Sequence, residues 1–233
     1  MPAPKTPKPP KMVNVKDNDI VYTTNYWSQL KLLLFKPLQF FESVKYESEY
    51  INIVIKYVVF FLILRAVLFI VGLYSDIREG GLVIIGVSLL TIILGALFGF
   101  IIPFINSAII HIGVLLFGGK QGFFNTFKLV TYSLFIGLIY STIATLIFEI
   151  LNIFIPTEAI TDITLMLPQL IISGAVGLIG LVHMIYTMVI GISYYHEMPK
   201  VRSFLAVIVI PAILIIFVTF ISVIIMLMLY STI

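Results

Sequence analysis

Five long apolar tracts dominate this chain and leave little choice of fold. They cover residues 51–74, 82–117, 128–155, 168–196 and 203–230. Each tract reaches the ~20 residues that an α-helix needs to cross the ~30 Å hydrocarbon core of a bilayer. Backbone groups in lipid must be hydrogen-bonded within the segment, which a helix achieves by itself. The tracts therefore predict an all-α, polytopic membrane protein built from five transmembrane helices.

The composition supports the same class of protein. Hydrophobic residues make up 61% of the 233 residues and charged residues only 11%, whereas soluble domains carry about a quarter charged residues. A surface that faces water cannot be built from so few charges. The chain has no cysteine, which excludes disulfides and thiolate metal sites.

The second tract is too long for one simple crossing. A straight helix over 82–117 would span roughly 50 Å at ~1.5 Å per residue. The tract either tilts and projects from the membrane or breaks near Gly95, Gly99 and Pro103. Two crossings are possible by length alone, so the distribution of charge has to decide between them.

Basic residues place the loops on the two sides of the membrane, because Lys and Arg gather in cytoplasmic loops. Counting 82–117 as one crossing puts Lys120 and Lys128 on the same side as the lysine-rich N-terminus. Counting it twice would put them outside. We therefore predict a multi-pass protein of the cell membrane with five crossings, the N-terminus in the cytoplasm and the C-terminus outside.

Two polar segments precede the first tract. Residues 1–24 are rich in proline and lysine, and we expect a disordered basic tail. Residues 25–50 carry apolar residues at helical spacing, which predicts short amphipathic helices, the second of them beginning at Pro37. These helices lie either in the membrane interface or against the end of the bundle. The basic charge of this region favours anionic lipid headgroups, and not nucleic acid, as its partner.

Small residues recur at four-residue spacing inside the tracts. In lipid there is no hydrophobic drive between helices, so small residues mark places where backbones approach closely. We interpret them as packing contacts within the bundle, with a homodimer face or a substrate passage as the alternatives. The positions are Gly95 and Gly99 in the second tract, Ser133, Gly137 and Ser141 in the third, and Gly177 in the fourth.

Ionisable side chains inside the tracts are few. Arg65 lies near the middle of the first tract, and its nearest candidate partner by depth is Glu149, so we expect these two to pair. His111, His183 and His196 lack metal-ligand spacing, and hydrogen bonds to hydroxyl or backbone groups explain them more simply. His111 and His183 are the two expected to approach each other.

Sequence motifs for catalysis are absent as well. The run FGGKQG at 117–122 contains Gly-Gly-Lys but lacks the rest of the phosphate-loop signature, and no serine-nucleophile or paired-aspartate motif occurs. We expect no catalytic, cofactor or metal site, and we read Lys120 and Lys128 as topological charges that also touch lipid phosphates.

The segment between the second and third tracts, HIGVLLFGGKQGFFNTFKLVTYS, carries a family resemblance. Its informative positions are His111, Gly118, Gly119, Lys120, Phe127, Lys128, Tyr132 and Ser133. Their order resembles the core signature of the Yip (Rab-GTPase-interacting) family of membrane proteins. Pro37 with Phe40-Phe41-Glu42 also looks like that family's prokaryotic members, and the resemblance covers about residues 30–230.

The resemblance implies a five-helix domain over 51–233, a cytoplasmic N-terminal region and no known catalytic centre. Eukaryotic members act in vesicle trafficking, contact small GTPases and shape ER and Golgi membranes. The isoleucine-rich, cysteine-free chain looks like an archaeal or bacterial member. We therefore expect a non-enzymatic scaffold, adaptor or membrane organiser with a protein partner or a second copy of itself. A small transporter or channel component is the alternative.

Overall fold

The computed structural model describes residues 26–153 and 163–230. Within these ranges the chain forms helices α1 (Tyr26–Phe35), α2 (Pro37–Ser43), α3 (Tyr50–Leu116), α4 (Phe123–Ile153), α5 (Ile163–His196) and α6 (Lys200–Tyr230). In this described part of the chain, five segments are long and apolar enough to cross a membrane: Tyr50–Leu73, Gly81–Leu116, Phe123–Leu151, Leu167–His196 and Lys200–Met228. The prediction of an all-α chain with five spans is confirmed. The predicted tail 1–24 lies outside the described residues.

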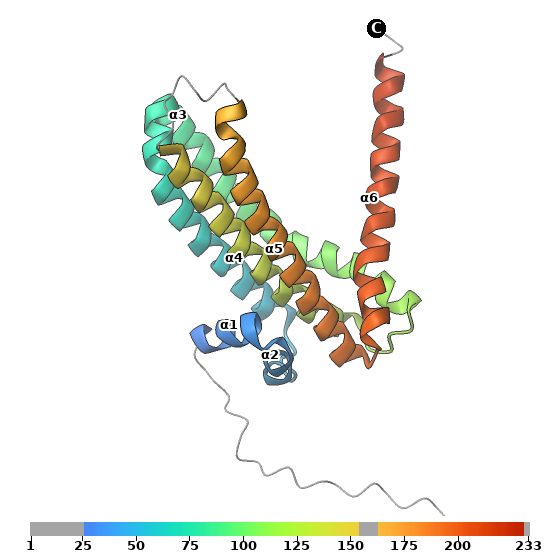
Figure 1. The fold of residues 1–233 in the computed structure, drawn as a ribbon. Helices are drawn as coiled ribbons and strands as arrows, with labels where there is room; N and C mark the ends of the chain where they lie inside the picture. The colour runs from blue at the N-terminus through green and yellow to red at the C-terminus, as the bar shows by residue number, and fades with distance from the viewer. Residues whose placement is uncertain (1–25, 154–162, 231–233) are drawn as a thin grey trace, which may run out of the picture.

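The long helices form a bundle, and the two short N-terminal helices cover one of its ends (Figure 1). Helices α3, α4 and α5 pack side by side, α1 and α2 lie across one end, and the last turns of α6 lie toward the other. Helix α6 contacts α3 and α5 through its first turns, where Ser203, Ala206 and Val207 are buried. Beyond these turns α6 stands clear of the other helices (Figure 1), and its side chains are exposed from residue 213 to 228.

Helix α3 contains the first two spans, which meet at Gly81. Gly81 has φ 59° and ψ −140°, a conformation open to glycine because it has no Cβ. The second tract then continues as helix to Leu116, and Figure 1 shows the last turns of α3 (light green) turning aside from its earlier part. Pro103 lies inside this helix, and a proline there removes a hydrogen bond and kinks the axis. The excess length predicted from the sequence is taken up by this bend.

Two glycines follow the last turn of α3 and end the helix. The amide of Gly118 donates to Leu115 O at 3.2 Å, and that of Gly119 to Val114 O at 2.8 Å. Gly118 has φ 93°. These two bonds, with Gly118 in the left-handed conformation, form a Schellman motif. At Gly119, a Cβ would lie 2.2 Å from Val114 Cγ1, so the second position also requires glycine.

Replacing Gly118 tests this helix end. Gly118→Ala is expected to lower the free energy of unfolding by about 1–2 kcal/mol, because a left-handed backbone costs an alanine that much. Gly122→Ala in the same loop is the matched control, since a Cβ there meets nothing within 4 Å. Denaturant titration in detergent micelles measures both variants. Equal losses in the two variants would contradict the assigned role of Gly118.

Most of the predicted small-residue contacts lie inside the bundle. A Cβ at Gly95 would lie 2.8 Å from the Phe61 ring, so this glycine lets the two spans of α3 approach each other. A Cβ at Gly99 would lie 3.4 Å from Cγ2 of Val58, so this glycine also faces the first span. On α4, a Cβ at Gly137 would lie 3.0 Å from the sulfur of Met184 on α5.

Two of the small residues do not pack within the bundle. A Cβ at Gly177 would meet nothing within 4 Å, and Ser141 is exposed and bonds the Leu138 carbonyl of its own helix at 3.0 Å. The prediction of a bundle contact is therefore wrong for these two residues. By contrast Ser133, two turns earlier on α4, is fully buried. A spacing of four residues identifies a helix face but does not say how far along that face a neighbour remains in contact.

Candidate functional site

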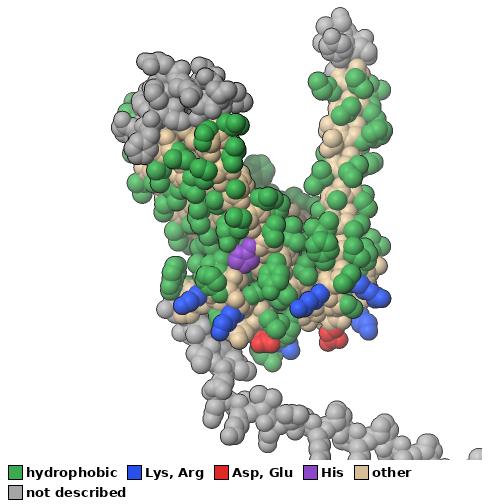
Figure 2. All heavy atoms as spheres, viewed as in Figure 1, with side chains coloured by type: hydrophobic (Ala, Val, Ile, Leu, Met, Phe, Trp, Pro, Cys, Tyr) green, Lys and Arg blue, Asp and Glu red, His purple; other side chains and the backbone are tan. Residues whose placement is uncertain are grey.

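The N-terminal strap, which we define as residues 26–49, is the part of the structure that differs most from a plain bundle. It comprises α1, α2 and the connection to α3, and lies across the end of the bundle (Figure 1). As the sequence predicted, α2 begins with Pro37 in its first turn. Figure 2 shows lysine and arginine side chains gathering at the same end, with a hydrophobic surface beyond them. The strap's buried residues are Leu33, Pro37, Phe40, Phe41 and Val44.

Phe41 inserts between α4 and α5. Its side chain is 0% exposed, and a Cβ on Gly191 would lie 2.9 Å from its ring. The ring also meets Tyr195 edge-on, with 5.9 Å between centroids. The hydroxyl of Tyr195 donates to the Phe41 carbonyl at 2.9 Å. Gly191 therefore provides the space for Phe41, and Tyr195 holds its backbone.

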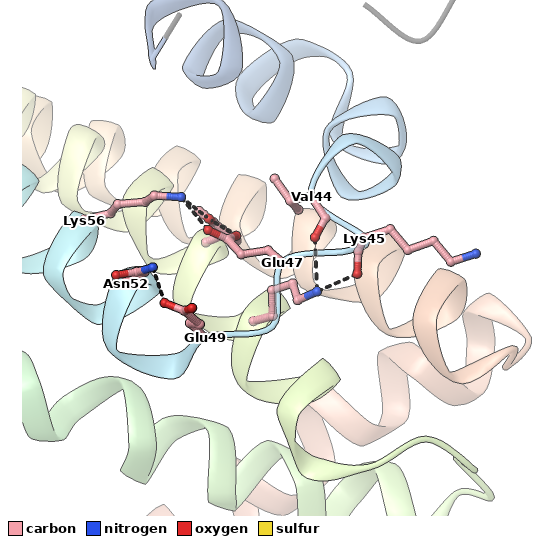
Figure 3. Close-up of polar contacts among 8 residues, drawn as sticks. Val44, Lys45, Glu47, Glu49, Asn52 and Lys56 are labelled. Carbon is pink, nitrogen blue, oxygen red and sulfur yellow. Dashed lines mark hydrogen bonds and ion pairs between the residues drawn. The ribbon is translucent and has the colours of Figure 1, made fainter. Parts of the chain in front are cut away.

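Lys128 on α4 binds the end of α2. Its Nζ donates to the carbonyls of Val44 at 3.1 Å and Lys45 at 2.8 Å, and Figure 3 shows these two carbonyls turned toward one ammonium nitrogen. Cations are favoured at the carbonyl end of a helix. The ammonium also lies over the rings of Phe124 and Tyr195, at 5.1 and 5.4 Å.

The buried position of Lys128 contradicts its predicted contact with lipid. Lys128 is only 1% exposed, so the prediction that it touches lipid phosphates is wrong. Lys120, in the loop after α3, is exposed and is still able to meet headgroups. Two lysines that look equivalent in the sequence differ because Lys128 points under the strap.

Glu47 fastens the strap to two spans at once. It accepts a hydrogen bond from the Tyr132 hydroxyl at 2.5 Å and forms an ion pair with Lys56. Figure 3 shows the side chains of Glu47 and Lys56 pointing toward one another. Tyr132 belongs to α4 and Lys56 to α3, and the Tyr132 ring also meets Phe40 of α2 edge-on at 4.9 Å. Partly buried networks of this kind hold a segment in one position because each polar group is satisfied by the others.

Two of the three histidines meet at the ends of the bundle helices. The Thr126 hydroxyl lies between His111 Nδ1 at 2.8 Å and His196 Nε2 at 2.9 Å, so α3, α4 and α5 are joined at their ends. The neighbour of His111 is thus His196, and the predicted approach of His111 to His183 is wrong. His183 instead bonds the Tyr140 hydroxyl at 3.2 Å. Each of the three histidines therefore has a hydroxyl partner, which agrees with the expectation from the sequence.

The expected Arg65–Glu149 pair does not form. The Arg65 guanidinium lies over the Phe61 ring at 5.2 Å, and the ion pair found in the described part of the chain is Lys56–Glu47. Both α3 and α4 start at the strap end (Figure 1). Arg65 is 15 residues into α3 and Glu149 is 26 residues into α4, which separates their depths by about 16 Å at ~1.5 Å per residue.

The family signature residues divide between packing and polar contacts. Phe127 is fully buried, with its ring 4.9 Å from that of Tyr50 and 4.6 Å from that of Phe104. His111, Lys128 and Tyr132 make the polar contacts described above. The arrangement joins the strap to the bundle, and in residues 26–153 and 163–230 no three metal-binding side chains come together.

Comparison with known families decides what kind of membrane protein this is. The family model of the Yip1 domain matches residues 31–223. The chain belongs to the Yip1 domain family. The match begins within α1, so most of the strap is part of this Yip1 domain and is not an appendage to it. No curated protein and no solved structure matches the chain significantly.

Sequence reasoning missed three anchors of this Yip1 domain, namely Phe41, Glu47 and Tyr195. One signal could have found Phe41, since a helix as short as Pro37–Ser43 is not stable alone in water and must bury its aromatic pair against something. The other contacts carry no local signal. Tyr132 and Glu47 are 85 residues apart, and Tyr195 and Phe41 are 154 apart.

Proposed function

We propose that this Yip1 domain protein is a non-enzymatic membrane scaffold that presents its N-terminal strap at the membrane surface. One observation carries the proposal: the strap is fixed from the inside by buried contacts while its outer side exposes large aromatic rings. These are Tyr26 at 73%, Trp27 at 72%, Phe35 at 74% and Tyr46 at 79% exposure. Aromatic rings favour the boundary between lipid and water.

Charge on the strap supports an anionic membrane surface as the partner. Lys31, Lys36 and Lys45 are exposed next to these rings. A lysine near an anionic leaflet contributes about 1 kcal/mol of attraction. The bundle would hold these groups at a fixed height, so that the protein organises lipid, or presents the surface to a protein partner, without carrying out a reaction.

The orientation of the protein is part of this proposal. Basic side chains gather at the strap end (Figure 2), which favours a cytoplasmic strap and an external C-terminus in the cell membrane. The chain has no cysteine, so single cysteines report their side cleanly. Lys120→Cys and Glu158→Cys, in the connection between α4 and α5, should react with an impermeant maleimide from opposite sides of intact cells or vesicles. Reaction of both from one side would contradict the five-span orientation.

Trp27 gives a direct test of the strap's location, because it is the only tryptophan in the chain. In proteoliposomes its emission should be quenched by lipids that carry a nitroxide near the headgroup, and little by lipids labelled deep in the chain. The reason is that the strap lies at the end of the spans and not among them. Depth-resolved quenching makes the measurement.

A matched control moves the tryptophan to a different depth. Trp27→Phe combined with Phe217→Trp places the indole within the α6 span, at a site that is 61% exposed, and should reverse the quenching order. If Trp27 emission in the unaltered protein is quenched by neither lipid, the strap does not lie in the membrane surface. The alternative function, a small transporter, predicts solute flux in proteoliposomes that is lost in Arg65→Ala, and such flux would contradict the scaffold proposal.

A further inference from the structure

A groove of about 570 Å³ lies where the strap meets α5 and the start of α6. Its walls come from the junction of α1 and α2, from the last turns of α5 and from Lys200 of α6. The volume falls within the range of small-molecule sites, about 300–1,000 Å³. Residues from positions 35–39 and from positions 186–200 thus form one concave surface, and the contacts of the strap with the bundle hold it open.

The charge of the groove has one sign. Within residues 26–153 and 163–230, its charged wall residues are Lys36 and Lys200, and no carboxylate lines it. Neither lysine pairs with an acidic group among the residues that the structure describes. Gln39 and Tyr194 add neutral hydrogen-bonding groups to the same walls. Two ammonium groups with neutral hydrogen-bonding groups beside them suit a phosphate, because lysine binds phosphate as a point charge.

The groove also extends into the apolar part of the bundle. Lys200 is the first residue of the last span, at the level where α5 ends with His196. Tyr186 and Ile190 line the other part of the groove, and they lie about 15 and 9 Å before the end of α5 at ~1.5 Å per residue. One end of the groove is therefore cationic and the other apolar.

We propose that this groove binds one anionic phospholipid, with its phosphate at Lys36 and Lys200 and the first part of an acyl chain along Tyr186 and Ile190. The inference rests on the proposed location of the strap at the membrane surface, and it names a specific lipid position there. A soluble anion would satisfy the lysines only, whereas a phospholipid satisfies both ends of the groove. The bound lipid would also link the strap to α5 and α6.

Native mass spectrometry of the full chain released from nanodiscs of phosphatidylglycerol and phosphatidylcholine tests this site. The unaltered protein should retain one phosphatidylglycerol, and Lys36→Gln with Lys200→Gln should weaken its retention by about 30-fold, equivalent to ~2 kcal/mol for two lysines. Lys45→Gln with Lys120→Gln is the matched control, because it removes the same charge at exposed positions outside the groove. The control should retain the lipid as the unaltered protein does.

Two further experiments test whether the acyl chain and the phosphate both contribute to lipid retention. Ile190→Trp, which fills the apolar end and keeps both lysines, should also reduce retention, and unchanged retention would overturn the placement of the acyl chain. Glycerol 3-phosphate at millimolar concentration should not displace the lipid, and displacement would assign the site to small anions. Equal loss in the two lysine pairs would show only general attraction and overturn the site. If Trp27 lies at the surface while the lysine variants retain the lipid, the groove fails and the scaffold proposal stands.

Discussion

Phe41→Ala is expected to lower the free energy of unfolding by about 3–5 kcal/mol, the usual cost of removing a buried phenylalanine ring. The ring is 0% exposed and fills the space left by Gly191, where even a Cβ would lie 2.9 Å from it. No side chain at Gly191 can move in to fill the vacated volume. Denaturant titration in micelles, followed by circular dichroism, measures the loss.

Phe35→Ala provides the control for this prediction. Phe35 lies six residues earlier in the strap but is 74% exposed, so its replacement should change stability by less than about 0.5 kcal/mol. The comparison removes any general effect of losing an aromatic ring from the strap. Comparable losses in the two variants would mean that the strap is not inserted between α4 and α5.

Lys128→Met is expected to cost about 2–4 kcal/mol. Methionine approximates the aliphatic part of the lysine side chain but leaves the carbonyls of Val44 and Lys45 without their donor. Hydrogen bonds to a charged group contribute about 1.5–3 kcal/mol each. Part of this loss is offset because a buried ammonium no longer has to be desolvated. Thermal unfolding gives the magnitude.

The Lys128 variant should also free the strap, which a general loss of stability would not do. Trp27 lies on the strap, so its fluorescence anisotropy should fall in Lys128→Met at temperatures where the bundle is still folded. Lys120→Met, at an exposed lysine one loop earlier, should leave both the melting temperature and the anisotropy unchanged. Unchanged anisotropy in Lys128→Met would show that other contacts suffice to hold the strap.

The sequence was sufficient for the features that depend on local pattern. Five spans follow from hydropathy because the bilayer imposes a length and a polarity on every crossing segment. The start of α2 at Pro37 follows from backbone chemistry that a single residue decides, because proline suits the first turn of a helix. The family signature likewise indicated the Yip1 domain that matches residues 31–223.

The predictions that were wrong depend on how each helix is rotated about its axis and on how deep each residue lies in the bundle. The pair of Arg65 and Glu149 was predicted from their expected depths in the membrane. The two helices place these residues about 16 Å apart along the bundle at ~1.5 Å per residue. His111 meets His196 and not His183, because helix periodicity does not say which neighbour a given face meets. Lys128 looked like a loop charge, yet α4 already begins at Phe123 and carries it beneath the strap.

Amide hydrogen exchange of α2 tests most directly whether the bundle holds the strap. A helix of seven residues has almost no stability of its own in water, so any protection must come from docking. In nanodiscs we predict that the amides of Phe40 to Ser43 exchange orders of magnitude more slowly than an unstructured peptide, and that Lys128→Met removes most of this protection. Exchange of α2 at the unstructured rate in the unaltered protein would contradict the docked strap.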